Sequence, residues 1–353
     1  MTICDGYGIL NIYDINEKWP LAARESFMSI ETKENITTTT SSEENVEKKA
    51  KTKKEKSKKE KTNKRRRRFG DRAEGRKLRT LIPMHRLMPY IMPTRNDAMN
   101  MFAESFDISR IDPFCRKKVK EGYTNFGFLH VLLAAYVRML SQNPGANRFV
   151  SGQKIYARNE IEVVMVVKKE MSSDSPDTCI KVVFSPYDTI DEVYEKFNAA
   201  VQSVVGNTDE SSFDKLAKII NYIPGLLLRW TVKLLNFLDY FGLLPRFLTK
   251  LSPFHGSLIV TSMGSLGIQP IYHHLYNFGN LPVFIAYGKK RTEKTVNSDG
   301  EVVSKRVIDI KVVTDERICD GYYFANAFKQ FKRYVEDPER LTVPPENIVE
   351  DID

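Results

Sequence analysis

The histidines and cysteines limit the chemistry that this chain could carry out. Its four cysteines are scattered without a CxxC pair, which favours neither a disulfide framework nor a zinc site and is typical of the reducing cytoplasm. We therefore expect no bound metal. Imidazole is the side chain that most readily moves protons near neutral pH. The candidates for that role are His130, His255 and the adjacent pair His273 and His274.

Some of these side chains also have a purely structural interpretation. His130 lies within a strongly apolar stretch, where an imidazole is usually a hydrogen-bonded core residue. Cys319 is expected to pack in the core rather than to act as a nucleophile. The pair His273 and His274 is of more interest, because it follows closely after a predicted strand that carries hydroxyl side chains.

Two segments near the C-terminus combine hydroxyl, carboxyl and glycine residues. The first, TDERICDGY at residues 314–322, lies where a predicted strand ends and a predicted helix begins. The second, GSLIVTSMGSLGI at residues 256–268, is a predicted strand followed by a turn. The predicted strand between them contains AYGK at residues 286–289.

Together, these segments resemble the chloramphenicol acetyltransferase-like superfamily, and most of all the catalytic domain of the acyltransferases of 2-oxo acid dehydrogenase complexes. The first is similar to the HxxxDG signature and, with its arginine, to the DHRxxDG version; the second is similar to FTISNLGxxG. PGANRF at residues 144–149 is similar to the PxxN segment before the family's central sheet. The resemblance covers roughly residues 80–342. It implies an α/β fold with a mixed sheet flanked by helices.

The resemblance implies the transfer of an acyl group from CoA or a similar thioester. In the family, a histidine removes the proton of an acceptor thiol or hydroxyl, and a serine hydroxyl donates to the oxyanion that forms on the thioester carbonyl. At the matching positions, Thr261 would be the oxyanion donor with Ser262 beside it, and Asp320 would hold the loop. The resemblance assigns structural places around the site to Arg317, Gly321 and Gly264.

Glu316 occupies the position of the catalytic histidine. A glutamate with an ordinary pKa of about 4.3 is about four units too acidic to take a proton efficiently from a thiol with a pKa of about 8.5. Burial could raise the pKa of such a carboxyl and restore part of the match. Alternatively, His273 or His274 could serve as the base.

Two functions are consistent with this pattern. The first is an acyltransferase that moves an acyl group between a CoA thioester and a small-molecule acceptor, in a channel between subunits of a homotrimer. The second is a catalytically inactive relative that uses the fold to bind CoA, an acyl group or a protein partner. Because neither a lipoyl-bearing domain nor a peripheral-subunit-binding domain precedes the core, we do not expect a standard subunit of a dehydrogenase complex.

The positive charge of the chain is concentrated in one segment. Residues 48–68 carry 14 lysines and arginines against two acids, a net charge of +12, whereas the whole chain carries +9. The rest of the chain is therefore net negative. The basic segment is either a patch for polyanions such as nucleic acid or acidic lipid, or a solvated linker, since no aromatic residues interleave for base stacking.

Composition divides the chain into four parts. Residues 31–64 contain only Ile36 and Val46 as aliphatic side chains larger than alanine, so we expect them to be disordered. The N-terminal residues lack the features of a signal peptide. The parts are an uncertain segment at 1–30, a Lys/Arg-rich linker at 31–68, an acyltransferase-like domain at 69–345 and an acidic tail at 346–353.

Hydrophobic periodicity places helices and strands along the domain. Residues 84–93 are expected to be extended, and residues 94–106 to form a helix capped by Thr94. We expect Thr261 and Glu316 at neighbouring strand ends, or facing each other across two subunits. Further helices are predicted at 126–142, 188–205 and 322–337, and strands at 148–158, 161–171, 178–186, 256–264, 282–290 and 307–316, with a hairpin turn at 296–302.

Residues 213–251 are the most apolar part of the chain. They contain no uncharged run of about 18 residues, which a membrane-spanning helix would need. Two interpretations remain, namely a pair of helices packed on the domain or a helix that lies in a membrane interface. The residues that interrupt the stretch are Pro224, Arg229, Lys233, Asp239 and Pro245.

Overall fold

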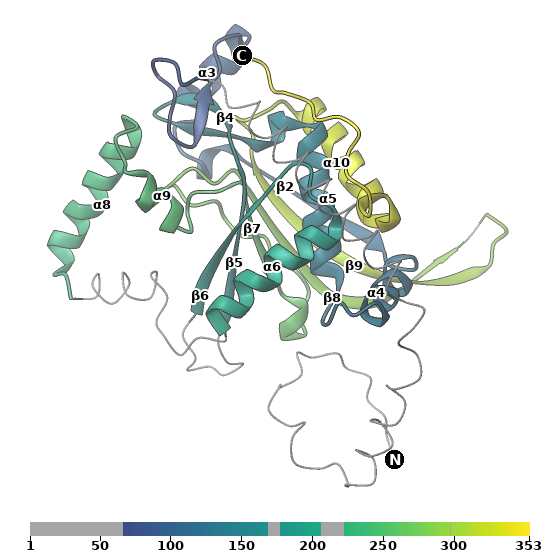
Figure 1. Cartoon of the computed structure of the whole chain (residues 1–353). Helices are drawn as coiled ribbons and strands as arrows, with labels where there is room; N and C mark the ends of the chain where they lie inside the picture. Colours follow the sequence, from purple (N-terminus) through teal and green to yellow (C-terminus); the bar gives the residue numbers. More distant parts are fainter. Residues whose placement is uncertain (1–65, 169–176, 206–221, 297) are drawn as a thin grey trace, which may run out of the picture. The chain divides into compact units, whose positions relative to one another are not determined.

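A six-stranded mixed sheet forms the centre of the fold (Figure 1). Its strand order is β2, β9, β8, β7, β5, β6, and β7 pairs in parallel with β5 and β8 while the other pairs are antiparallel. The strands are β2 (Met99–Asp107), β5 (Ile161–Lys168), β6 (Asp177–Phe184), β7 (Leu258–Ser262), β8 (Val283–Val296) and β9 (Val302–Asp315). A second, three-stranded sheet consists of β1 (Gly75–Lys77), β4 (Lys154–Arg158) and β3 (Arg148–Ser151).

This computed structural model describes residues 66–168, 177–205, 222–296 and 298–353. Arg68–Asp353 is one compact unit. The predictions for residues 1–30 and for nearly all of the linker at 31–68 lie outside the described residues. Within the described ranges, no helix has the length and apolar character needed to cross a membrane.

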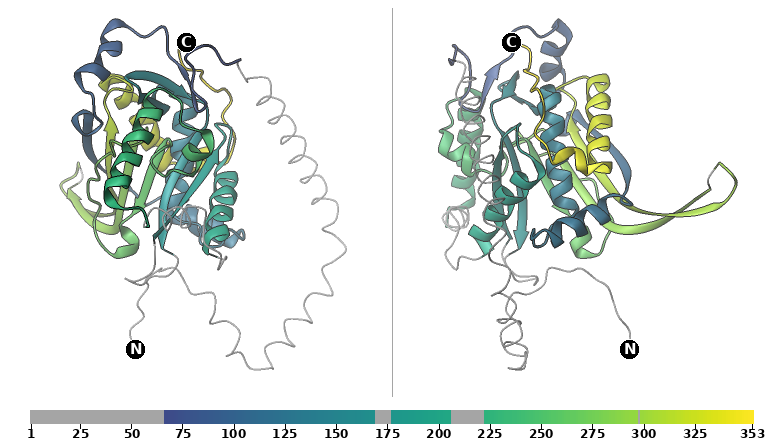
Figure 2. Two further views of the ribbon diagram at one scale, coloured as in Figure 1. Left: turned by 90° about the vertical axis from the view of Figure 1, so that its left-hand side faces the viewer. Right: turned by 45° about the vertical axis from the view of Figure 1, so that its right-hand side comes forward.

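Three long helices cover one face of the large sheet (Figure 2). α5 (Phe128–Gln142) lies between α10 (Gly321–Glu336) and α6 (Ile190–Val205) and contacts both. This arrangement confirms the predicted fold class, a mixed sheet flanked by helices. The other helices are α3 (Pro83–Ile91), α4 (Ile111–Lys120), α8 (Gly225–Tyr240) and α9 (Arg246–Leu251), with short 3-10 turns η2 (Asn96–Ala98), η3 (Pro144–Asn147), η4 (Gly264–Leu266) and η5 (Pro338–Leu341).

The strand β7 separates two hydrophobic cores. Leu258 and Val260 belong to the main core beneath the helices, whereas Ile259 joins Leu275 and Phe284 in a smaller core on the opposite face. Successive side chains of a strand point to opposite faces. Thr261 therefore points to the face of the smaller core, which the loop before β8 covers.

Most of the predicted elements are confirmed. The helices at 126–142, 188–205 and 322–337 form, and so do the strands on both sides of them. Thr189 caps α6, because the Glu192 N–H donates to its hydroxyl at 3.4 Å and its own N–H donates to the Glu192 carboxylate at 2.8 Å. The strands β8 and β9 extend beyond the predicted lengths and form a long hairpin.

The prediction for residues 84–106 is wrong in both halves. A helix, α3, begins at Pro83, where proline occupies the first helical turn. The residues expected to be helical form the edge strand β2, which pairs along its whole length with β9, from Met99 opposite Asp315 to Asp107 opposite Val307. The apolar spacing of this segment suits either structure, and the hydrogen bonds offered by β9 decide between them.

Helices form within residues 213–251, as both interpretations of this segment predicted, but α8 has little apolar packing on the domain. Asp239 is the buried residue of α8, and most of its leucines and aromatic residues are exposed. In Figure 1, α8 lies at the periphery of the unit, away from the large sheet. Residues 213–221 lie outside the described part of the chain.

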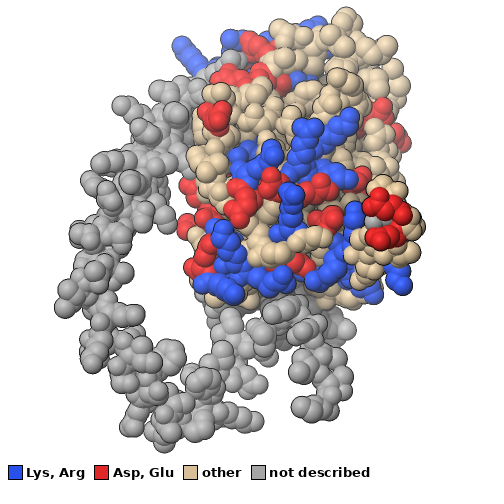
Figure 3. All heavy atoms as spheres, turned by 90° about the vertical axis from the view of Figure 1, so that its right-hand side faces the viewer, with Lys and Arg blue, Asp and Glu red and all other residues tan. Residues whose placement is uncertain are grey.

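Charged side chains on the face around the β8–β9 hairpin are mixed in sign. Lys290 and Arg306 both pair with Asp112, at 2.6 and 2.8 Å, and Arg291 pairs with Asp309 at 2.6 Å. Figure 3 shows blue and red side chains interspersed over this face, with no area of a single sign. The basic character of the chain is therefore not a property of this surface.

Candidate active site

Thr261 lies near the end of β7, opposite Ala286 of β8. β8 fixes its backbone on one side, and on the other side the pairing of β7 with β5 ends at the preceding residue, Val260. Its side chain is partly exposed, and its hydroxyl donates to none of the residues that the structure describes. The sheet thus holds a hydroxyl that is free to donate to a ligand.

The residues that follow Thr261 have structural roles. Ser262 points to the opposite face, where its hydroxyl hydrogen-bonds Tyr287; burial raises the pKa of Tyr287, and this bond partly offsets the rise. The Ser265 N–H donates to the Ser262 hydroxyl at 3.4 Å. A Cβ at Gly264 would lie 2.7 Å from the carbonyl oxygen of Gly288, so that only glycine lets the turn approach β8 this closely.

A buried ion pair holds the turn between β9 and α10. The Arg317 guanidinium donates to both carboxylate oxygens of Asp315, at 2.8 and 2.7 Å, and it also donates to the carbonyl of Met92 at 2.9 Å. The exposed fractions of the two charged side chains are 3% and 1%. A paired, desolvated guanidinium of this kind fixes the turn rigidly.

Glu316 projects from this braced turn into solvent. Its N–H donates to the carbonyl of Ala98 at 2.8 Å, which fixes the backbone although the carboxyl is exposed. Asp320 caps α10, because its carboxylate accepts from the Tyr323 N–H at 2.8 Å. A Cβ at Gly321 would meet no atom within 4 Å, so a single chain gives no steric reason for this glycine.

Thr261 and Glu316 lie far apart in one chain. Thr261 is opposite Ala286, and Ala286 is opposite Lys311. Glu316 lies five residues beyond Lys311, in the direction of the start of β8. Strand geometry therefore separates the two residues by about 17 Å along β9 and about 10 Å across the sheet. The prediction that Thr261 and Glu316 lie at neighbouring strand ends is wrong for a single chain. A single chain does not test the alternative prediction, in which the two residues face each other across two subunits.

His273 lies on the same face of the sheet as Thr261. Its ring stacks on Phe284 with centroids 4.4 Å apart, and Phe284 is opposite Ile259, two residues before Thr261. The Nε2 atom of His273 is buried and has no hydrogen-bond partner among the described residues. Burial, and then the neighbouring His274, lower the pKa of His273, so the imidazole is neutral at pH 7 and able to accept a proton.

The other candidate side chains have structural surroundings. His274 is exposed and contacts Tyr276 edge-on. His255 hydrogen-bonds the Ser252 hydroxyl at 2.9 Å, and burial, followed by the charge of Lys181, lowers its pKa well below the usual value. Burial raises the pKa of Cys319 to about 12, which suits a core thiol and not a nucleophile.

His130 is a hydrogen-bonded core residue. Its Nδ1 accepts from the Gly127 N–H at 3.1 Å, and its Nε2 lies 3.4 Å from the side-chain oxygen of Asn198. Burial lowers the pKa of His130 to about 4, although both hydrogen bonds act in the opposite direction. The hydrogen bond from the Gly127 N–H to His130 therefore stabilises the start of α5.

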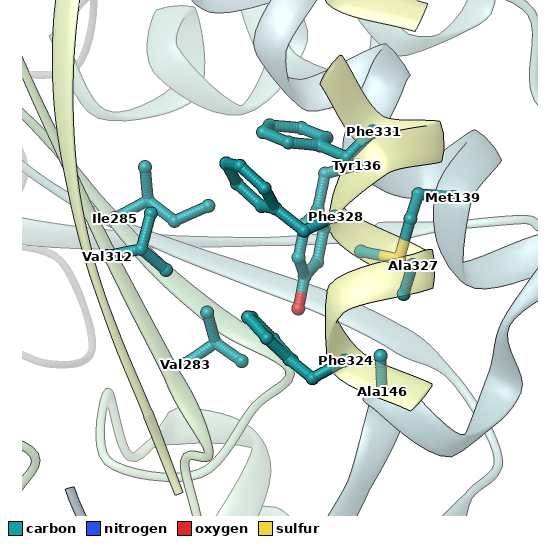
Figure 4. Close-up of a pocket in the computed structure, with 10 residues that line it drawn as sticks. All are labelled: Tyr136, Met139, Ala146, Val283, Ile285, Val312, Phe324, Ala327, Phe328 and Phe331. Carbon is teal, nitrogen blue, oxygen red and sulfur yellow. The ribbon is translucent and has the colours of Figure 1, made fainter. Parts of the chain in front are cut away.

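A pocket between α5, α10 and the sheet contains none of the candidate residues. In Figure 4, Tyr136 and three phenylalanines of α10 point toward valine and isoleucine side chains of β8 and β9. Its lining is apolar, so it belongs to the core and lacks polar groups to orient a ligand. Among the described residues, no cluster of histidine, cysteine or carboxylate side chains could hold a metal ion.

Comparisons with known proteins agree with the motifs. Residues 252–343 match the family described as 2-oxoacid dehydrogenases acyltransferase (catalytic domain). In this segment the chain is related to that family, which confirms the resemblance that its two motifs indicated. A comparison with curated proteins gave no sequence match.

Solved structures with a similar fold include acetyltransferases. A probable dihydrolipoamide acetyltransferase from Listeria monocytogenes is 14% identical, covers 78% of this chain and 98% of its own, and has a TM-score of 0.47. The dihydrolipoamide acetyltransferase of Azotobacter vinelandii is 14% identical over 74% and 93% of the two chains, with a TM-score of 0.44. A chloramphenicol acetyltransferase is 11% identical over 71% and 92%, with a TM-score of 0.40.

The residue that sequence reasoning missed is Asp315. The sequence drew attention to Asp320 as the carboxylate that holds the loop, but the ion pair is made by Asp315. The signal was present, since Asp315 and Arg317 are two residues apart on either side of Glu316. Their mutual burial could not be seen without the fold.

Proposed function

We propose that this protein is an acyltransferase that moves an acyl group between a CoA thioester, or a similar thioester, and a small-molecule acceptor. One observation carries the proposal. Thr261 presents an unengaged hydroxyl from a rigid strand end, and the Asp315–Arg317 pair braces a turn that carries Glu316 at the catalytic position of the related family. The fixed backbone of both motifs supports the proposal.

The proposed reaction has two steps. A base removes the proton from the acceptor thiol or hydroxyl, and the resulting nucleophile attacks the thioester carbonyl carbon. The carbonyl oxygen becomes an oxyanion that accepts a hydrogen bond from the Thr261 hydroxyl. The intermediate then collapses, the carbon–sulfur bond breaks, and the base returns its proton to the departing thiolate.

The base is either Glu316 or an imidazole of the pair His273 and His274, of which His273 is on the face of Thr261. Because Glu316 and Thr261 are far apart in one chain, Glu316 can serve only if a second copy brings it to Thr261, as in a homotrimer whose channel lies between subunits. His273 would need no second copy if its imidazole reaches the acceptor bound at Thr261, since both residues are on the same face of the sheet. The two candidates thus differ in their dependence on assembly.

The second candidate function is a catalytically inactive module that binds CoA, an acyl group or a protein. The exposure of Glu316 favours it, because a side chain in open solvent is not enclosed in a site that excludes water from the reaction. The structural features that hold the motifs in place are equally compatible with binding alone.

The test uses the full chain. Thiol release is measured from a panel of acyl-CoA thioesters with varied acceptors, CoA binding by calorimetry, and mass by ultracentrifugation. Turnover in a trimer supports the proposal, and CoA binding without turnover supports the inactive module. The absence of both turnover and CoA binding would mean that the chain retains the fold of the family without its site.

Mixed assemblies test whether the site is shared between copies. Chains with Thr261→Ala and chains with Glu316→Gln are co-expressed. If each site takes Thr261 from one copy and Glu316 from the next, a quarter of the interfaces in a random mixture are intact, and about a quarter of the wild-type activity returns. No recovery above that of either variant alone would place the whole site within one chain.

A further inference from the structure

α8 carries a continuous stripe of exposed apolar side chains. At intervals of three and four residues along the helix these positions fall on one face. The stripe, called here the α8 stripe, consists of Leu227, Trp230, Leu234, Phe237 and Phe241, with exposed fractions of 57%, 66%, 56%, 57% and 58%. Just beyond it, Leu243 and Phe247 are 64% and 68% exposed, so the apolar surface continues to α9.

Polar contacts, not apolar packing, attach α8 to the domain. Arg72 donates to the Asp239 carboxylate at 3.0 Å and to the carbonyl of Tyr240 at 3.0 Å. Ser151 donates to the Asp239 carboxylate at 3.1 Å, and the Tyr240 hydroxyl donates to Gln153 at 2.9 Å. All of these contacts are at the C-terminal end of the helix. The α8 stripe is therefore held in place while its apolar face remains uncovered.

The charges around the α8 stripe are positive. Arg229 and Lys233 lie on one side of it, Lys250 follows on α9, and none of the three forms an ion pair with a described residue. Lys233 lies over the Trp230 ring, 5.2 Å from its centroid. The acid of α8, Asp239, is neutralised by Arg72. The surface thus combines exposed leucine and aromatic residues with unpaired positive charge.

We propose that α8 and α9 bind the surface of an anionic lipid membrane. A helix with an apolar stripe, flanking basic residues and aromatic side chains lies in the interface with its apolar face among the acyl chains. The stripe is too short and too interrupted to cross a bilayer. The basic charges beside the stripe complement anionic headgroups, and tryptophan favours this depth.

Trp230 itself is the reporter for the test. The chain has two tryptophans, Trp19 and Trp230, so Trp19→Phe leaves Trp230 as the sole emitter in the full chain. Vesicles of phosphatidylcholine with about 30% phosphatidylglycerol are added, and lipids brominated in the acyl chain distinguish insertion of Trp230 from headgroup contacts of the basic segment 48–68. We expect a blue shift of the emission and quenching by lipids brominated in the acyl chain.

Two matched variants give the control. Leu234→Glu with Phe237→Glu places two charges in the α8 stripe, and vesicle binding should fall about tenfold or more. Val302→Glu with Val343→Glu adds the same charge at two other exposed apolar residues, and binding should be unchanged. We expect both variants to fold, because all four positions are exposed. Circular dichroism checks this.

Two outcomes would overturn the proposal. Trp230 emission that is unaffected by vesicles and brominated lipids would show that the stripe does not enter a membrane. Emission that is already blue-shifted without lipid, and that shifts to the red on dilution or in the Leu234→Glu, Phe237→Glu variant, would assign the stripe to a contact between copies of this chain.

Discussion

Thr261 and Glu316 are five residues apart in the register of the central sheet, with β8 between their strands. Each is held by its own rigid support, Thr261 by the pairing of β7 and Glu316 by the buried pair on either side of it. A reaction that uses both residues therefore requires two copies of the chain. A reaction within one chain has to use a different base, and His273 is the candidate on the same face of the sheet as Thr261.

The hydroxyl of Thr261 is expected to stabilise the oxyanion. Thr261→Ala should lower kcat/KM about a hundredfold to a thousandfold, because it removes a donor that stabilises the transition state by about 2.7–4 kcal/mol. Thr261→Ser keeps the hydroxyl and should retain most of the activity. Equal loss in both variants, measured as thiol release, would show that the hydroxyl is not the donor.

The two candidate bases give opposite results in mutants. If Glu316 is the base, Glu316→Gln should remove most of the turnover, about a hundredfold or more, and Glu316→His should raise it. If the base is an imidazole, Glu316→Gln should be tolerated. The damaging change should then be His273→Ala or, if His274 is the base, His274→Ala. Full activity in all three loss variants would exclude every one of these side chains as the base.

Loss of the Asp315 carboxylate should destabilise the domain. Asp315→Asn leaves the Arg317 guanidinium buried without its counter-ion, and removing one partner of a buried pair costs about 3–5 kcal/mol. Urea unfolding would measure the loss. Glu339→Gln is the control, because its pair with Lys117 is 58% exposed on both sides and should contribute less than about 1 kcal/mol. Similar values for the two variants would contradict the role assigned to the pair.

His130 should make the domain less stable in mild acid. Its pKa is about 4 in the folded chain and about 6.5 when unfolded. The unfolded chain therefore binds more protons between these values, and the free energy of unfolding falls as the pH drops from about 6.5 to about 4, by about 3 kcal/mol in total. Above pH 6.5 the full stability is present. His130→Gln should lack this slope, and parallel slopes in the two proteins would refute the assignment.

The basic segment should contribute little to the stability of the domain. Residues 31–64 offer few apolar side chains for packing, so deletion of residues 1–67 should leave the thermal midpoint of the domain nearly unchanged. If the segment binds polyanions, retention of the full chain on heparin should fall steeply with salt, and the deletion should abolish it. A large drop in the thermal midpoint would show that the segment packs on the domain.

The sequence by itself indicated the resemblance to an acyltransferase family, which residues 252–343 match, and most of the elements. Motif order and the types of residue at 256–268 and 314–322 do not depend on tertiary contacts, and a buried helix such as α5 has an apolar pattern too strong to adopt another structure. The position of Thr261 at a strand end and of Glu316 at a turn followed from the same local patterns.

Only the tertiary structure decided the rest. Residues 99–107 are a strand because β9 offers a complete set of hydrogen-bond partners, and no local pattern reveals a partner so distant in the chain. The separation of Thr261 from Glu316 depends on the antiparallel direction of β9, and the role of Asp315 depends on its burial with Arg317. The exposure of α8 likewise depends on how the rest of the chain folds, because no packing element covers its apolar stripe among the described residues. Direction, burial and exposure are properties of the folded chain, because they arise from contacts between residues far apart in sequence.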